Sequence, residues 1–166
     1  MKNPAPLHAR FLLNLTRFWL YVALILFSGC RNAPLTVGFL GGLTGPFSQL
    51  GVDGRKGAQM ALDEFNDGGG FKGQKVFMKV ADDLGTREGG LEAVKAFKRH
   101  GIFFMVGPMT SEAAALLPDF LNPEEFLIIS PTASGDQFSK KDDAFFRVAV
   151  SNREMANKLA RHAFLA

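Results

Sequence analysis

The chain has 166 residues, 47% of them hydrophobic, and a formal net charge of +3, so it is long enough for one domain or for part of a larger one. Three of the 19 basic residues, Lys2, Arg10 and Arg17, precede Cys30, which leaves 16 basic residues against the 16 acidic ones. The remaining chain is formally neutral, and this removes the electrostatic argument for a nucleic-acid partner.

The N-terminus has the pattern of a targeting segment. Positive charges come first, an apolar stretch covers 18–27, and Ser28 and Gly29 lead to Cys30. About ten apolar residues suit the core of a signal peptide better than a membrane span, which needs ~20. We therefore expect a signal peptide over 1–29. The alternative is an uncleaved anchor, because 11–13 could extend the apolar stretch.

Downstream of Cys30, patterns typical of strands and helices alternate along the chain. Apolar or alternating runs predict four strands, at 35–40, 75–80, 103–106 and 126–129. Three helices are expected, at 53–66, 86–100 and 112–121. Repeated strand–helix–strand units predict an α/β fold, a partial doubly wound parallel sheet with flanking helices.

The amphipathic faces of the first two helices indicate which side chains face the core. In the first helix these are Ala58, Ala61, Leu62 and Phe65, and in the second they are Leu91, Val94 and Phe97. Thr86 is the expected N-cap of the second helix.

The last part of the chain predicts an extended segment at 145–150 and a further helix. Ser151 to Glu154 form a capping box, and the helix that follows runs to Ala166 with Leu159, Ala163 and Phe164 uncovered. A helix with a bare apolar face is marginal in water. We therefore expect the chain to stop within a domain.

No constellation of residues predicts catalysis, a cofactor or a metal site. The three histidines lie in the targeting segment, at a helix end (His100) and in the last helix. No serine stands in a nucleophile elbow, and Cys30 is the only cysteine. Asp82 and Asp83 follow a strand. Their carboxylates could act as Mg²⁺ ligands, but the favoured interpretation is that they cap the loop before Thr86.

Two segments, 106–111 and 129–134, share one frame: apolar, small, Pro, any residue, small, Ser. Each follows a predicted buried strand, so both place hydroxyls at the carboxyl ends of strands, where open α/β sheets bind ligands. Ser111 precedes a helix, whose free N–H groups suit a carboxylate. The 132–134 segment offers carbonyls and a hydroxyl that suit an ammonium group. Together they predict a site for an amino-acid zwitterion, unless both serines only cap local structure.

With these loops, the chain resembles the periplasmic substrate-binding proteins of branched-chain amino acid ABC transporters (the type I, leucine-binding family). The motifs that carry the resemblance are Thr44-Gly45-Pro46, Gly51, Gly57-Ala58, Ala61, Asn66, Gly69-Gly70-Phe71-Lys72-Gly73, Asp82-Asp83, Val106-Gly107, Ser111 and Ser130-Pro131-Thr132-Ala133-Ser134.

The resemblance implies a binding protein, not an enzyme, in which two lobes close on an amino acid and deliver it to a membrane permease. It assigns the ligand carboxylate to Ser111 and the ammonium to the Thr132 carbonyl and the Ser134 hydroxyl, with Ala133 beside them. Leu50 occupies a position where the family often has Tyr. A ligand-sensing regulatory module of the same fold is the alternative function.

The resemblance also implies domain boundaries and a location. Residues 30–150 would be a partial N-terminal lobe and 151–166 the start of a truncated second lobe, so that this chain alone would bind weakly or not at all. The segment before Cys30 resembles the lipobox of bacterial lipoproteins, with Phe27 where Leu is usual. It implies a lipid anchor on Cys30 and a periplasmic or cell-surface protein attached to the membrane.

Overall fold

A computed structural model describes residues 34–46, 48–117 and 126–165. The predicted signal peptide and Cys30 lie outside these ranges. Within them, five strands form one sheet: β1 (Thr36–Gly41), β2 (Phe77–Asp82), β3 (Phe104–Val106), β4 (Leu127–Ser130) and β5 (Phe145–Arg147). All neighbouring strands are parallel and their order is β2-β1-β3-β4-β5. This confirms the predicted parallel α/β sheet, in which β2 and β5 are the edge strands.

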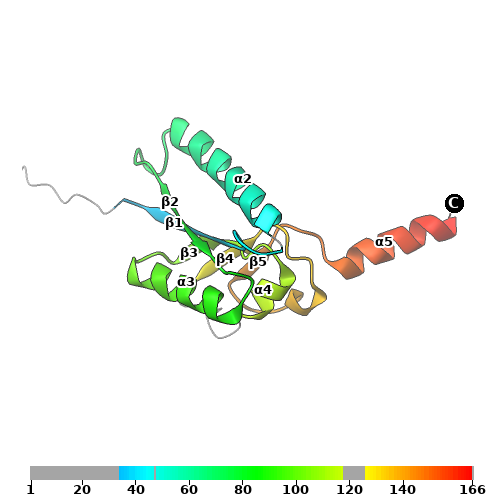
Figure 1. The fold of residues 1–166 in the computed structure, drawn as a ribbon. Helices are drawn as coiled ribbons and strands as arrows, with labels where there is room; N and C mark the ends of the chain where they lie inside the picture. Colours follow the sequence, from blue (N-terminus) through cyan, green and yellow to red (C-terminus); the bar gives the residue numbers. More distant parts are fainter. Residues whose placement is uncertain (1–33, 47, 118–125, 166) are drawn as a thin grey trace, which may run out of the picture. The chain divides into compact units, whose positions relative to one another are not determined.

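Helices lie on both faces of the sheet, as the doubly wound prediction requires. The described helices are α2 (Ser48–Asp67), α3 (Arg87–Arg99), α4 (Ser111–Ala115), α5 (Asn152–Leu165), which projects away from the sheet, and the short 3₁₀ helix η2 (Asp136–Phe138). α2 covers one face, and α3 and α4 lie on the other (Figure 1).

The buried core lies on the side of the sheet that carries α3 and α4. Its side chains come from those helices, the strands and the loop after β4: Leu40, Ala93, Val94, Phe97, Ile102, Met105, Ala114, Leu117, Phe126, Ile128, Ala133, Phe138 and Phe145. The predicted cap of α3 is confirmed, because the Thr86 side chain accepts a hydrogen bond from the Gly89 N–H. Val94 and Phe97 are buried as predicted, and Leu91 is partly buried.

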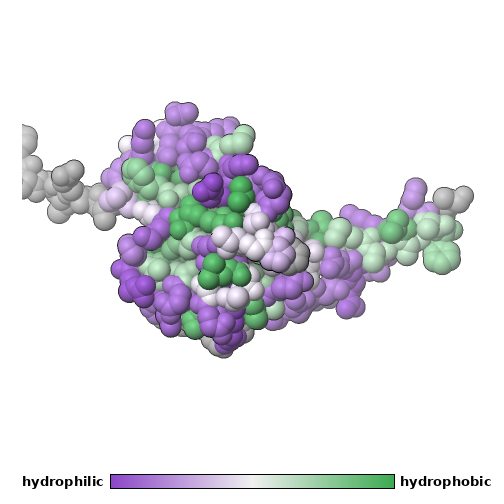
Figure 2. Space-filling model, in the orientation of Figure 1, coloured by the Kyte–Doolittle hydropathy of each residue, from purple (hydrophilic) through white to green (hydrophobic). Residues whose placement is uncertain are grey.

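The face of α2 that was predicted to be buried is largely uncovered. Phe65 is 49% exposed, Ala61 is exposed, and Ala58 and Leu62 are only partly buried. These side chains line an open apolar cavity of about 460 Å³ between α2 and the strands. Figure 2 shows hydrophobic surface reaching the outside of the molecule beside the hydrophilic outer side of α2. Periodicity identified the inward face of the helix but could not show that little packs against it.

α4 is shorter than the predicted helix, and α5 is present where a helix was predicted. The helix expected at 112–121 is shorter, since α4 ends at Ala115 and Leu116 is its C-cap. The half of the predicted capping box that Ser151 supplies is present, because the Glu154 N–H donates to the Ser151 hydroxyl over 3.2 Å. α5 has no buried residue, and Phe164 is 91% exposed. In the part of the chain that is described, no helix combines the length and apolar character needed to cross a membrane.

Candidate functional site

A cleft of about 430 Å³ opens at the carboxyl ends of β3 and β4. Its lining residues are Leu50, Met109, Thr110, Ser111, Glu112, Thr132, Ser134, Gly135, Gln137 and Asn152. The structure thus brings together four of the predicted ligand-binding residues: Leu50, Ser111, Thr132 and Ser134. The fifth, Ala133, is fully buried in the core and does not line the cleft.

The side chain of Ser111 is fixed by the second loop. Its Oγ accepts a hydrogen bond from the Gly135 N–H over 3.0 Å. Thr110, not Ser111, is the N-cap of α4, because its hydroxyl accepts from the Ala113 N–H. A serine hydroxyl that already accepts from the protein still has its O–H to donate. Ser111 can therefore act as a hydrogen-bond donor to a carboxylate in the cleft.

Two hydrogen bonds join the two loops behind the cleft, and a third lies within the second loop. The Ser130 hydroxyl donates to the Pro108 carbonyl over 2.6 Å and accepts from the Ala133 N–H over 3.1 Å. The Thr132 hydroxyl donates to the Met109 carbonyl. Ser130 is fully buried, where such bonds are stronger than in water. The repeated sequence frame thus builds two loops that support each other.

The second loop contributes two residues with available acceptors, Thr132 and Ser134, to the lining of the cleft. Among the described residues, no hydrogen bond occupies the Thr132 carbonyl or the Ser134 hydroxyl, whereas the Ser134 carbonyl accepts from the Asn152 N–H over 2.9 Å. Thr132 is exposed and Ser134 is partly buried. These two oxygens are the groups expected to receive an ammonium.

The charge of the cleft comes from one residue that the sequence analysis missed. Glu112 is the only ionisable side chain among the lining residues, and no lysine or arginine is among them. A carboxylate bound here would be held by neutral donors, while an ammonium group would also be attracted by Glu112. The cleft therefore suits a zwitterion better than a simple anion.

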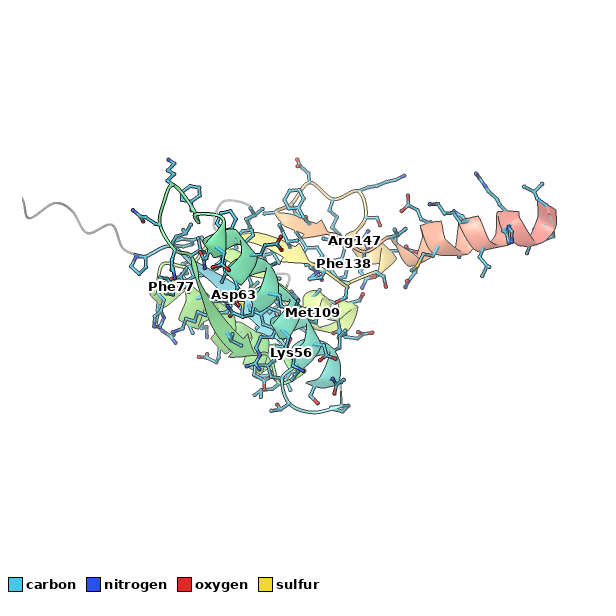
Figure 3. The ribbon with its side chains drawn as sticks, turned by 90° about the horizontal axis from the view of Figure 1, so that it is seen from above. Lys56, Asp63, Phe77, Met109, Phe138 and Arg147 are labelled. Atoms are coloured by element: carbon cyan, nitrogen blue, oxygen red, sulfur yellow. The ribbon has the colours of Figure 1, made fainter. Side chains whose placement is uncertain are left out.

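The apolar wall of the cleft is made by Leu50 and Met109. Leu50 is 40% exposed, whereas Met109 is 3% exposed and lies beside α2 (Figure 3). Gly54 permits this contact, because a Cβ at that position would lie 2.3 Å from the Met109 Cε. Gly51 allows α2 to begin this close to the loop after β1, since its added Cβ would lie 2.0 Å from the Gly42 carbonyl oxygen.

Asp82 and Asp83 organise loops, which confirms the favoured interpretation. Asp82 Oδ1 accepts from the N–H groups of Leu43 and Leu84, and its Oδ2 accepts from the Thr44 hydroxyl. Asp83 Oδ1 accepts from the Gly85 N–H. Within the described ranges, no group of three or more His, Cys, Asp or Glu side chains could hold a metal ion.

The two aspartates have opposite pKa shifts. For Asp82, desolvation raises the pKa, but the hydrogen bonds from Leu84, Thr44 and Leu43 outweigh it and the net pKa is lowered. For Asp83, burial raises the pKa; the Gly85 hydrogen bond opposes this and the charge of Asp82 adds to it. Asp83 Oδ2 is buried and has no hydrogen-bond partner among the described residues.

Comparison with known proteins decides the family. A model of the periplasmic binding protein family matches residues 34–164. The chain belongs to this family. Its members bind substrates for transport and are not enzymes, as predicted.

Two similar relatives carry names of amino-acid-binding proteins. The Leu/Ile/Val-binding protein BraC3 of Rhizobium johnstonii is 38% identical over 120 residues, which cover 72% of this chain and 33% of that protein. The Leu/Ile/Val-binding protein homolog 3 of Brucella melitensis is 33% identical over 141 residues, 84% of this chain and 38% of the relative. The chain thus spans little more than a third of the length of these relatives.

Solved structures share the fold. The substrate-binding protein of an ABC transporter from Sphaerobacter thermophilus has a TM-score of 0.70 and 25% identity, over 81% of this chain and 37% of its own. A leucine complex of such a protein from Desulfitobacterium hafniense has a TM-score of 0.63 and 25% identity, over 79% of this chain and 38% of its own.

Proposed function

We propose that this chain contributes one side of an extracytoplasmic binding site for an aliphatic amino acid. The observation that carries the proposal is the cleft itself. Ser111, whose O–H can donate, lines this cleft together with Thr132 and Ser134, whose carbonyl and hydroxyl can accept. A donor and acceptors in one cleft match a carboxylate and an ammonium on the same carbon. Ala133 supports this loop from within the core.

Leu50 and Met109 favour an aliphatic ligand side chain. Both are apolar and flexible, and neither offers a hydrogen bond to a polar side chain in the ligand. The names of the relatives, which specify Leu, Ile and Val, agree with this choice. From the same family resemblance, we propose that the ligand is delivered to an ABC permease.

A thermal-shift panel tests the ligand class. A compound that binds only the folded chain raises its unfolding temperature. Leucine, isoleucine and valine should raise this temperature, whereas glutamate and lysine should not. The apolar wall would desolvate the charged side chain of either ligand, and Glu112 would also repel the side chain of glutamate. A shift with the charged amino acids alone would contradict the proposal.

We also propose the domain boundaries expected from the sequence. Residues 1–29 are a signal peptide, 30–150 a partial N-terminal lobe and 151–166 the start of a second lobe. The extensive exposure of α5 and the span of about a third of the relatives support this division. Protein surface beyond this chain would then complete the shell around the ligand.

Cys30 is proposed as a lipid attachment site that holds the protein on a membrane face. The pattern Leu26-Phe27-Ser28-Gly29-Cys30 supports it. In a bacterial host, the wild-type chain should fractionate with membranes and gain the mass of lipid, whereas Cys30→Ser should do neither. Equal fractionation without a mass difference would rule out lipidation.

A further inference from the structure

Arg147, the last residue of β5, makes two hydrogen bonds to the loop that forms the cleft. Its Nη1 donates to the Gly135 carbonyl over 2.8 Å and its Nη2 donates to the Ser139 hydroxyl over 2.7 Å. Arg147 pairs in register with Ser130, so the ends of β4 and β5 lie side by side. The guanidinium therefore reaches across the loop that leaves β4.

Gly135 is held at both of its backbone polar atoms. Its N–H donates to Ser111 Oγ, and its carbonyl accepts from Arg147. The peptide unit before it is held as well, because the Ser134 carbonyl accepts from the Asn152 N–H. The position of the Ser111 hydroxyl thus depends on a loop that Arg147 fixes from the opposite side.

The charge of Arg147 is not used for an ion pair in the described part of the chain. Its two partners are a carbonyl and a hydroxyl, and the nearby Asp136 pairs instead with Arg153 over 3.4 Å. Arg147 and Phe138 lie close together in Figure 3 and line a second cavity of about 660 Å³. Arg147 does not line the cleft, so direct contact with the ligand is not its role.

We infer that Arg147 is a positioning residue, which orders the 134–139 loop and thereby holds the Ser111 hydroxyl in the geometry that receives a carboxylate. An arginine suits this role because its planar fork directs two N–H bonds at two acceptors at once, whereas a lysine has no such fixed geometry. The effect on ligand affinity rests on the proposed function; the effect on the loop does not.

The test compares Arg147→Gln with Arg153→Gln, a matched control. Both arginines border the second cavity, and each substitution removes one positive charge. Two quantities are measured on the whole chain: the hydrogen-exchange rate of the Gly135 amide without ligand, and the affinity for leucine by NMR titration. Arg147→Gln should raise the exchange rate and weaken leucine binding, each by about five- to tenfold.

Arg153→Gln should leave both quantities within about twofold, because its ion pair is exposed. Equal effects of the two variants would show that only positive charge matters and would overturn the inference. Arg147→Lys keeps the charge and serves if Arg147→Gln does not fold. It should fall between wild type and Arg147→Gln, and wild-type values for Arg147→Lys would also overturn the inference.

A double substitution separates positioning from general stability. If Arg147 acts through Ser111, Arg147→Gln should weaken leucine binding less in a Ser111→Ala background than alone. Additive losses would contradict that route. If wild type does not bind leucine, the proposed function fails, while the Gly135 exchange rate still decides whether Arg147 orders the loop.

Discussion

Ser111 Oγ, at the start of α4, accepts a hydrogen bond from the Gly135 N–H over 3.0 Å. This bond joins the two loops whose serines the sequence placed at neighbouring strand ends. The Gly135 N–H uses only a lone pair of the hydroxyl oxygen, so the Ser111 O–H is still available to donate to a ligand. The bond therefore both joins the two loops and orients a hydrogen-bond donor.

Ser111→Ala should weaken leucine binding by about 1.5–3 kcal/mol, because a hydrogen bond to a charged carboxylate is lost. The substitution also leaves the Gly135 N–H without its acceptor. NMR or calorimetric titration of the whole chain measures the change. Thr36→Ala is the control, since its hydroxyl bonds the Pro34 carbonyl at the start of β1 and does not line the cleft. Unchanged affinity in Ser111→Ala would remove this residue from the site.

Ligands that lack one charge should bind more weakly than leucine, and unequally. 4-Methylpentanoate, which has no ammonium, should bind worst, because it loses the Thr132 and Ser134 acceptors and is repelled by Glu112. Leucinamide keeps the ammonium and should retain part of the affinity. Competition against leucine measures the order, and tighter binding of 4-methylpentanoate than of leucinamide would contradict the charge assignment.

Gly51→Ala should destabilise the chain by about 1–3 kcal/mol, because the new methyl group overlaps the Gly42 carbonyl oxygen and backbone must shift. Gly57→Ala, in the same helix, has no atom within 4 Å of its added Cβ and should gain about 0.5–1 kcal/mol. Urea unfolding of both variants measures the difference. A Gly51→Ala variant as stable as wild type would mean that α2 begins farther from Gly42.

The two aspartates should give opposite pH dependences. The lowered pKa of Asp82 contributes stability that is present above its unfolded-state pKa and is lost as pH falls through its folded pKa. The raised pKa of Asp83 works in reverse: its ionisation opposes folding as pH rises through the interval between the unfolded and folded values.

Asp82→Asn should therefore cost about 1–2 kcal/mol at neutral pH, and its deficit should shrink in acid. The stability of Asp83→Asn relative to wild type should be greater at neutral pH than in acid. Urea midpoints at both pH values measure these differences. The same pH trend in both variants would contradict the opposite shifts.

The sheet and four of the residues that line the cleft could be predicted from the sequence, because both depend on local patterns. Apolar runs followed by Pro-containing turns located β3 and β4, and parallel strands place their exits at one edge, so Ser111 and Ser134 line the same cleft. The bare face of α2 was not predictable, since periodicity does not report what packs against it. Arg147 and Glu112 were missed because their roles depend on contacts across the fold. Ala133 follows the shared frame, yet its small side chain faces the core.

Mapping leucine binding onto assigned backbone amides tests the central claim most directly. Addition of leucine to the labelled chain should shift the amides of Ser111, Glu112, Ser134 and Gly135, in a saturable way and with millimolar or tighter affinity. The amides of α5 beyond Asn157 and the edge of β2 should not move. Shifts confined to the apolar cavity between α2 and the sheet, or none up to the solubility limit of leucine, would contradict an amino-acid site in this cleft.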